Sequence, residues 1–403
     1  MTMENCVRVC AQEGRKFGLI WFGAAISLAE IEAGLWSRGC TSAVVLGHLV
    51  GGFMLFLAGM LGARLRKNGM ECTREFFGVP GMVFFAAANV LQLVGWTAVM
   101  LAQGTYAAKG LVAKCPAPLL TVLLGLLVMA WIFVGLRSFS YVTTVTMVLL
   151  LGMVAVLTWR VFHGGAEVVP LEEAPSFWSV FELSLAMPLS WLPLISDYTK
   201  ETPAPKTACG VSAVVYTLGS LWMYAVGIGL ARIGQDNITG GIGFVHMGIW
   251  ALLIVLISTT TTTFLDAYSA GESAKAVFAK VPPKVVGCVV CLLGILLAWL
   301  GIMDKYINFL YLIASIFVPM ATVMLVSWGT RSLRGRRLDY CASPAATMGN
   351  ILAFVAGVLV YHLGPKVVTA LPPSVLTILV CGVLAFVLNM LTAWAIPMAK
   401  SAK

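Results

Sequence analysis

Long apolar runs recur from one end of the chain to the other, and they constrain its fold more than any other feature. One of them, APLLTVLLGLLVMAWIFV at 117–134, contains no charged residue. A helix needs roughly 20 such residues to cross a hydrocarbon core of about 30 Å. The chain is 60% hydrophobic and only 11% charged over 403 residues, which is outside the range of soluble domains. The sequence therefore predicts an all-α polytopic membrane protein.

The apolar runs predict about 12 transmembrane helices. The first six are expected at 17–37, 41–63, 81–106, 117–136, 138–162 and 177–197, and the second six at 208–232, 242–271, 285–303, 306–329, 346–364 and 374–398. Such helices expose apolar side chains on most of their outer surface. The lipid bilayer is therefore an expected partner of the chain.

The basic residues predict the orientation of these helices. Most of the 26 Lys and Arg residues fall in alternate connections, counted from the N-terminal segment, such as RLRKNG at 64–69 and RSLRGRR at 331–337. Connections rich in Lys and Arg stay in the cytoplasm, so we expect a multi-pass protein of the plasma (inner) membrane with both termini cytoplasmic. The formal charge of +9 is explained by loops close to lipid headgroups. No nucleic-acid partner is therefore expected, and no obligate protein partner is evident.

The sequence has no motif that would support an intramembrane enzyme. The patterns HExxH, GxSxG, Walker A and GxGxxG do not occur. The one CxxC, CVVC at 288–291, lies inside an apolar run and has no second CxxC or nearby histidine, so we interpret it as packing rather than metal or redox chemistry. The chain is predicted not to be an enzyme and to need no cofactor.

Two of the predicted helices are interrupted at their centres. The first span contains GAAIS at 23–27, and the sixth contains AMPLSWLP at 186–193. Interrupted helices at matching positions, an odd number of spans apart, indicate an inverted repeat with a transporter's binding site at the breaks. We therefore predict a 5+5 repeat with discontinuous helices 1 and 6, in a single transporter domain over 1–398 made of units 17–162 and 177–329 and appended helices at 346–398. Gly and Pro are also common in membrane helices, which is the alternative explanation for either break alone.

The eighth span ends in a polar stretch, STTTTTFLDAYSAG at 258–271. On a helix, Val255, Thr259, Thr262, Thr263 and Asp266 fall within about 100° of one another. Threonine hydroxyls can simply bond back to their own helix. Several hydroxyls that lead to an ionisable residue at membrane depth nevertheless favour a functional stripe.

The third span carries a second polar stripe, made of Asn89, Gln92, Trp96 and Gln103 within about 60° of a helical wheel. It is the clearest candidate for a surface that binds substrate. The alternative is that its amides join neighbouring helices and its tryptophan fills space.

Glu30 is the third candidate feature, because it lies on the face of the first span that also carries Gly23, Ser27 and Gly34. Glu32 points elsewhere, toward the outer interface, and is expected either to extend its carboxyl group to that interface or to pair with Arg38. A carboxyl group at membrane depth costs a few kcal/mol unless it faces a cavity, a partner or a proton. We therefore expect Glu30 to face the cavity.

These stretches resemble those of the nucleobase:cation symporters of the NCS1 type, which have the LeuT-like inverted-repeat fold. The resemblance is carried by WFGAAISLAEI, NVLQLVGWTAVM, ISDYTK and STTTTTFLDAYSAG, and it covers nearly the whole chain by hydropathy. Within that family the chain is most similar to the CytX-like transporters of hydroxymethylpyrimidine. The resemblance implies a LeuT-like fold and cation-coupled uptake.

The resemblance also implies a sodium site between the first and eighth spans. Its ligands would be the carbonyls of Gly23, Ile26 and Val255 and the side-chain oxygens of Ser258 and Thr259. Where relatives can have asparagines, this chain has Thr260 and Phe264, so Asp266 is expected to replace an amide contact to substrate. Proton coupling is the alternative to sodium.

For the substrate, the resemblance implies a flat heterocycle held by a glutamine and sandwiched between aromatic rings. Gln92 matches the glutamine, while Trp96 lies one turn later than the family's indole. An aminopyrimidine presents a donor and an acceptor side by side, which suits Gln92 or a neutral Glu30. The predicted substrate-binding residues are Ser27, Glu30, Asn89, Gln92, Trp96, Trp191 and Asp266.

The predicted function is secondary active import of a small flat heterocycle with Na+ or H+ by alternating access. Hydroxymethylpyrimidine, a thiamine precursor, is the first choice of substrate. Cytosine, another nucleobase or a hydantoin is the alternative, and an amino-acid carrier ranks behind them. A channel or receptor would need only the polar stripes and not the paired breaks.

Overall fold

The chain is helical throughout the part that the structure describes. The computed structural model describes residues 3–112, 114–134, 139–164, 167–170, 175–235, 249–278, 280–333 and 342–394, and among these there is no strand. The helices of the first half are α1 (Met3–Ala25), α2 (Leu28–Ser37), α3 (Thr41–Leu65), α4 (Gly69–Leu111), α5 (Ala117–Val134), α6 (Phe139–His163), α7 (Phe177–Ser190) and α8 (Leu192–Thr199). Those of the second half are α9 (Pro205–Arg232), α11 (Ile249–Ala274), α12 (Pro283–Trp299), η2 (Ile302–Lys305), α13 (Tyr306–Leu333), α14 (Pro344–Leu363), η3 (Gly364–Lys366) and α15 (Pro373–Trp394).

Each predicted span overlaps a helix, but two of the predicted beginnings are wrong. The ends of four predicted spans, at 135–136, 138, 242–248 and 395–398, lie outside the described residues. α1 begins at Met3 rather than at 17, and α4 begins at Gly69 rather than at 81. Hydropathy detects only the apolar part of a helix and misses polar turns that precede it.

A capping box explains where α4 begins. The side chain of Asn68 accepts the backbone N–H of Glu71 at 2.8 Å, and the side chain of Glu71 accepts the backbone N–H of Asn68 at 3.0 Å. The added segment joins the predicted span at a kink, where Gly78 has a φ of 69° and precedes Pro80 by two residues. Glycine tolerates this positive φ at little cost.

Seven helical segments in the described part are long and apolar enough to cross a membrane. Three of them combine neighbouring elements, namely α7 with α8, η2 with α13, and α14 with η3. The bent pair of α1 and α2 makes an eighth if it counts as one span. α5, α12 and the described apolar part of α6 are shorter. The structure thus confirms an all-helical polytopic membrane protein. The number of twelve crossings stays a prediction.

Both predicted breaks are present, but they differ in kind. α1 and α2 meet at 54°, because Ser27 is extended (φ −133°, ψ 156°) and begins a new helix. At the second break Trp191 alone separates α7 from α8, with φ −90° and ψ −7°, and Phe177–Thr199 forms one apolar span that is not bent by more than 40°. Pro188 and Pro193 interrupt the hydrogen bonds there without forcing a sharp turn.

The contacts between helices have the symmetry expected of two repeated units. α1 and α2 pack on α9, whereas α7 and α8 pack on α3, and α4 packs on α11. Exchanging each helix with the one five spans away leaves this set of contacts unchanged. The division at 162 and 177 into two repeats is consistent with this pattern and stays a prediction.

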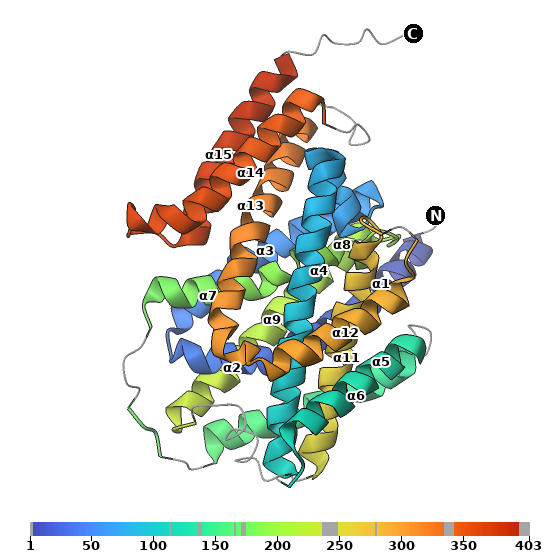
Figure 1. Ribbon diagram of the computed structural model, residues 1–403, viewed down its shortest axis with the longest axis vertical. Helices are drawn as coiled ribbons and strands as arrows, with labels where there is room; N and C mark the ends of the chain where they lie inside the picture. The colour runs from blue at the N-terminus through green and yellow to red at the C-terminus, as the bar shows by residue number, and fades with distance from the viewer. Residues whose placement is uncertain are drawn as a thin grey trace.

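α14 and α15 lie beside α13 at the top of Figure 1, away from α5 and α6. The buried share of each span also distinguishes the central helices from the peripheral ones. In the span Phe177–Thr199, 94% of the apolar window is buried, against 28% in Pro373–Thr392. Large apolar side chains such as Leu91, Leu300 and Val383 are exposed on the outside, as expected for surfaces that face lipid. The sixth span therefore lies in the centre of the bundle, where its break is sheltered from lipid.

Candidate binding site

A small cavity lies where the two breaks meet α4, α9 and α11. Its wall contains Ala24, Ser27, Glu30, Leu93, Trp96, Met100, Met187, Ser190, Trp191, Leu194, Tyr216 and Asp266. The cavity volume is about 20 Å³, enough for one water-sized molecule. Five of the seven predicted substrate-binding residues, namely Ser27, Glu30, Trp96, Trp191 and Asp266, therefore share one wall.

The first break fixes the position of Glu30. The hydroxyl of Ser27 accepts the backbone N–H of Glu30 at 3.3 Å and so caps α2. Glu30 Oε1 accepts the hydroxyl of Tyr216 at 2.7 Å, and Oε2 accepts the hydroxyl of Ser220 at 2.6 Å. The carboxyl group is therefore held by two donors from α9 while it lines the cavity.

Tyr216 and Ser220 were not predicted from the sequence, although a signal for them exists. Polar residues recur every four positions on the otherwise apolar α9, at Ser212, Tyr216, Ser220 and Tyr224. Residues four apart share one face of a helix. This third polar stripe is the one that faces Glu30.

Two groups of aromatic rings contribute to the cavity. Trp191 contacts Trp21 edge-on with ring centroids 5.5 Å apart, and Trp21 contacts Tyr216 at 5.9 Å. Trp96 contacts Phe309 of α13 at 5.6 Å, again edge-on. The indole Nε1 atoms of Trp21 and Trp96 are buried and have no hydrogen-bond partner among the described residues. Trp96 therefore brings both a ring and a free donor to the cavity wall.

Gln92 and Asn89 are buried beside the cavity rather than in its wall. Gln92 Nε2 donates to the backbone carbonyl of Ser190 at 3.0 Å and to Asn89 Oδ1 at 2.8 Å. Asn89 Nδ2 donates to Ser273 Oγ on α11 at 2.7 Å. These amides join α4 to the second break and to α11, as the alternative interpretation of the stripe had it. Gln92 Oε1 remains without a partner in the described part of the chain.

Asp266 is the member of the α11 stripe that reaches the cavity. No described residue donates a hydrogen bond to its carboxyl group, although its side chain is 3% exposed. Thr263 uses its hydroxyl within the helix, donating to the carbonyl of Thr259 at 2.6 Å. Part of the stripe is thus ordinary back-bonding, whereas the carboxyl group of Asp266 has no hydrogen-bond donor among the described residues.

The five predicted sodium ligands lie on two helices that contact each other, α1 with its break and α11. Gly23, Ile26 and Thr259 are buried. The side chain of Thr259 also lies against α4, because a Cβ on Gly104 would be 3.0 Å from its Cγ2 atom. Val255 and Ser258 belong to α11, but their side chains lie outside the described part. The ion site stays a prediction.

A larger space opens at the predicted outer end of the bundle. It has a volume of about 520 Å³, and its wall includes Glu32, Arg38, Pro170, Gln235 and Tyr306. Tyr306 separates this vestibule from the cavity: its hydroxyl donates to the carbonyl of Ala29 at 3.1 Å, and its ring lies 6.3 Å from that of Trp96. A solute in the vestibule is therefore one aromatic side chain away from the cavity.

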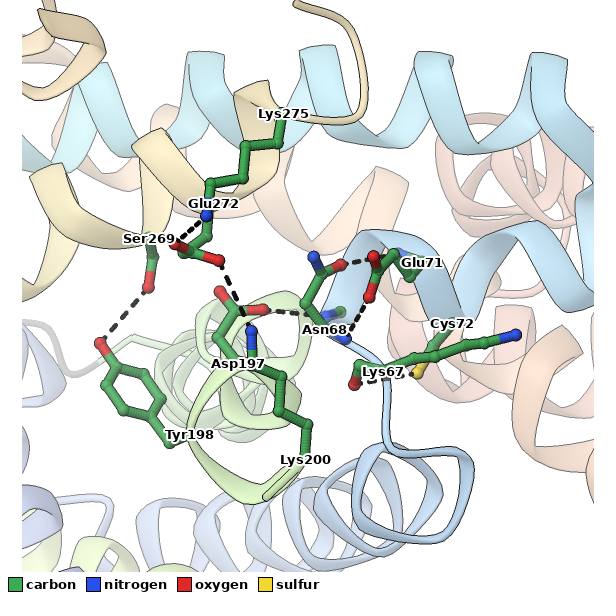
Figure 2. A network of polar contacts seen from close by, with 11 residues as sticks. Lys67, Asn68, Glu71, Cys72, Asp197, Tyr198, Lys200, Ser269, Glu272 and Lys275 are labelled. Atoms are coloured by element: carbon green, nitrogen blue, oxygen red, sulfur yellow. Dashed lines mark hydrogen bonds and ion pairs between the residues drawn. The ribbon is translucent and has the colours of Figure 1, made fainter. Parts of the chain in front are cut away.

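The opposite, predicted cytoplasmic end is closed by a network of polar contacts (Figure 2). Asp197 Oδ1 accepts the backbone N–H of Gly69 at 2.9 Å, which ties α8 to the beginning of α4. Lys200 forms an ion pair with Glu272 of α11 at 3.5 Å. Three elements that are far apart in the sequence thus meet at this end.

Comparisons with known proteins agree on the kind of molecule. A family model described as permease for cytosine/purines, uracil, thiamine, allantoin matches residues 15–384. YxlA of Bacillus subtilis (strain 168), which carries the provisional name of a purine-cytosine permease, is 23% identical over 360 residues, covering 77% of this chain and 74% of YxlA.

Solved structures show the same fold. Mhp1 in an inward-facing conformation is 19% identical and has a TM-score of 0.75, with 96% of this chain and 92% of Mhp1 covered. Mhp1 in a closed conformation with bromovinylhydantoin bound, described as a nucleobase-cation-symport-1 family transporter, has a TM-score of 0.76 at 19% identity, with 96% and 94% covered. A Na+-coupled sialic acid symporter in an outward-open state is 14% identical with a TM-score of 0.67, covering 96% of this chain and 91% of the symporter.

Proposed function

Because the chain belongs to the family of permeases for cytosine and purines, uracil, thiamine and allantoin, we propose that it imports a small flat heterocycle together with a cation by alternating access. The family makes it a transporter of the nucleobase:cation symporter type and not an enzyme. Hydroxymethylpyrimidine is the substrate we propose, and cytosine, another nucleobase or a hydantoin is the alternative.

The cavity wall is the observation that carries this proposal. The indoles of Trp96 and Trp191 and the carboxyl groups of Glu30 and Asp266 all line it. Aromatic side chains bind the faces of flat rings, and carboxyl groups accept hydrogen bonds from ring or exocyclic N–H groups. This combination fits a flat heterocycle that carries N–H donors better than a purely apolar solute.

Asp266 favours an amino-substituted ring in particular. Its carboxyl group lines the cavity and has no donor among the described residues. An unpaired carboxyl group at membrane depth is costly, so the exocyclic amine of a substrate would stabilise the bound state. Uracil lacks that amine, whereas hydroxymethylpyrimidine and cytosine carry it.

Entry requires the cavity to enlarge. Drug-sized and similar ligands occupy pockets of roughly 300–1,000 Å³, far more than the cavity of about 20 Å³. Met100 and Met187 in the wall are unbranched and can change rotamer readily. We propose that the ring of Tyr306 moves aside from Trp96 to admit substrate from the vestibule.

Release requires the other end to open. The bond from Gly69 to Asp197 and the ion pair between Lys200 and Glu272 hold α4, α8 and α11 together at that end. Alternating access would break these contacts after Tyr306 has closed the outer path. The two ends thus supply the two gates that coupled transport requires.

For the coupling ion we propose Na+ held by the carbonyls of Gly23, Ile26 and Val255 and by oxygens of Ser258 and Thr259, with H+ as the alternative. α1 ends at Ala25 and α2 begins at Leu28, so the helix is interrupted at the residues that would supply the carbonyls of this site. Contact between α1 and α11 supports a site shared by the two helices.

Uptake into proteoliposomes tests the proposal. Radiolabelled hydroxymethylpyrimidine and cytosine should accumulate above the outside concentration when a Na+ or H+ gradient is imposed, and unlabelled uracil should compete poorly. A channel would only equilibrate the solute, and a receptor would not move it. Equal competition by uracil would overturn the assignment of an amine-bearing substrate.

A further inference from the structure

A buried histidine continues the hydrogen bonds of Glu30 away from the cavity. His48 of α3 has no exposed surface. Its Nε2 lies 2.5 Å from Ser220 Oγ, the hydroxyl that donates to Glu30 Oε2 at 2.6 Å. Its Nδ1 lies 3.0 Å from the carbonyl oxygen of Val44 and 2.5 Å from Ser184 Oγ. An unbroken line of hydrogen bonds therefore joins the cavity wall to α3.

The partners of Nδ1 determine its protonation. The carbonyl of Val44 can only accept a hydrogen bond, and Ser184 donates its own hydroxyl to the same carbonyl at 2.5 Å. Nδ1 must therefore carry a hydrogen, which it donates to these two oxygens. On the imidazole, only the protonation of Nε2 is not determined by its partners, because Ser220 Oγ can either donate or accept.

Two arrangements satisfy every group between His48 and Glu30. In the first, an imidazolium donates from Nε2 to Ser220, and Ser220 donates to an ionised Glu30. In the second, a neutral Glu30 donates to Ser220, and Ser220 donates to an unprotonated Nε2. Each arrangement holds one proton that the two titratable groups share.

The two arrangements interconvert by a balanced proton shift. The Nε2–H bond of His48 breaks as a new O–H bond forms on Ser220, and the original proton of Ser220 passes to Glu30 Oε2. The imidazolium and carboxylate become a neutral imidazole and a carboxylic acid. No other reactant is needed, and the net charge of the group stays the same.

No basic side chain of the described residues pairs with Glu30 or His48. The ring of Tyr224 on α9 lies edge-on to His48 with centroids 4.7 Å apart, and its hydroxyl donates to the carbonyl of Leu183 at 3.4 Å.

The other titratable groups near the pair have hydrogen-bond partners that do not change between the two arrangements, with one exception. Tyr216 of α9 donates to Glu30 in either arrangement, and Tyr306 of α13 donates to the carbonyl of Ala29. On α7, Glu182 accepts hydrogen bonds from Ser374 of α15. The exception is Asp266 of α11, which faces the same cavity as Glu30.

We propose that Glu30, Ser220 and His48 form a proton relay that couples protonation to occupancy of the cavity. This inference rests on the transport function proposed above. A substrate N–H directed at Glu30 favours the carboxylate and drives the shared proton toward His48, whereas an empty cavity favours the acid. The relay gives the chain a proton-binding site that is separate from the predicted sodium ligands.

The first arm of the test needs no substrate. In protein with nitrogen-15-labelled histidine and the other histidines replaced by glutamine, Nδ1 of His48 should stay protonated while Nε2 shows the averaged signal of a shared proton. Ser220→Ala and Glu30→Gln should each convert Nε2 to an unprotonated nitrogen over the same pH range. Ser220→Thr, which keeps the hydroxyl, should restore the shared signal.

The second arm adds hydroxymethylpyrimidine or cytosine to the same labelled protein in proteoliposomes, without sodium. Bound substrate should move the Nε2 signal toward that of a protonated nitrogen, because the shared proton shifts to His48, and Ser220→Ala should show no such change. Ser212→Ala is the matched control, because Ser212 bonds within α9 to the carbonyl of Ala208 at 2.6 Å and is outside the relay.

An Nε2 signal in Ser220→Ala that equals the wild-type signal overturns the relay, and so does a wild-type Nε2 signal that bound substrate leaves unchanged. If no heterocycle is taken up, the proposed function fails while the first arm still decides the relay.

Discussion

Replacing Gly69 by alanine should open the predicted cytoplasmic end of the protein. Gly69 is the first residue of α4, and an added Cβ would lie 1.7 Å from the carbonyl oxygen of Pro193 and 2.8 Å from its carbonyl carbon. The obstacle is backbone, so no side-chain rotation can relieve it. α4 and α8 would have to separate by more than about 1 Å, because real contacts to a Cβ are rarely shorter than 3.0 Å.

The size of the effect follows from the cost of overpacking. Such a clash costs about 1–3 kcal/mol, which shifts the equilibrium between the closed and open ends by roughly 5- to 150-fold. The separation also breaks the bond from the Gly69 N–H to Asp197, which is 2.9 Å long in the closed structure. The substitution thus acts on the closed state and spares the open one.

Labelling of Cys72 measures this equilibrium. Cys72 lies one turn after Gly69 and is only 1% exposed, so in the closed state it should react slowly with a membrane-impermeant maleimide. In inside-out vesicles, with the other cysteines replaced by serine, Gly69→Ala should raise the labelling rate 5-fold or more.

Gly210→Ala is the control for the labelling experiment, because a Cβ there meets nothing within 4 Å. It should leave the rate unchanged. A Gly69→Ala protein that folds, transports and labels like the wild type would refute the argument that this contact holds the end closed.

Three further variants test other parts of the structure. Asp266→Asn should weaken competition by hydroxymethylpyrimidine and cytosine by roughly 5- to 100-fold while leaving the weak competition by uracil unchanged, because an amide N–H group replaces one of the two acceptor oxygens of the carboxyl group; competition assays in proteoliposomes measure this. Glu182→Gln should lower the free energy of unfolding by about 1–3 kcal/mol, since the carboxylate accepts both the N–H and the hydroxyl of Ser374 at 2.5 and 2.6 Å; a denaturant series against wild type checks it. Ser258→Ala with Thr259→Ala should flatten the dependence of uptake on sodium concentration more than it changes the substrate Km, and an unchanged sodium curve would place the ion elsewhere.

Hydropathy and local pattern predicted the helical class and both breaks, because each of these depends on a short continuous stretch of sequence. The extended Ser27 and the two prolines around Trp191 interrupt their helices through local backbone chemistry. The capping box before α4 is equally local, with Asn68 and Glu71 three residues apart. It was overlooked because the segment is polar.

The partners of Glu30 could not be predicted in this way. Tyr216 and Ser220 lie 186 and 190 residues away in the sequence, and no local pattern states which faces of two distant helices will meet. On α3, His48 is a single polar residue among glycines and apolar side chains, so no repeating pattern marks the face on which it lies. The sequence does show that polar residues recur every four positions on α9. This pattern identifies one face of the helix, but not the helix against which that face packs.

Gln92 shows why a match to a family residue does not fix a role. A glutamine in the third span was expected to bind the substrate, which stays a prediction for Gln92; the structure shows that its amide nitrogen is bonded to the backbone carbonyl of Ser190 and to Asn89, while its Oε1 has no partner among the described residues. The second break frees that carbonyl, and a freed carbonyl inside a membrane needs a donor. Whether a polar side chain serves the ligand or the backbone depends on which groups the neighbouring helix leaves unpaired.

The difference between the two breaks assigns them different parts in transport. At the first break the 54° bend is closed by the Ser27 cap, and Glu30 is bound to two donors of α9, so α2 and α9 should move as one body. At the second break the described cross-link on the cavity side is the bond from Gln92 to Ser190, while α8 is tied at its far end to Gly69 through Asp197. α8 is also bonded to α3, since Ser196 donates to the carbonyl of Ala58 and Thr199 to that of Gly59. Once the contacts of Asp197 with Gly69 and of Lys200 with Glu272 are lost, α8 can therefore move with α3 and bend relative to α7 at Trp191. We therefore expect the second break to act as the hinge on which the predicted cytoplasmic end opens, and the first to hold substrate in place while it does so.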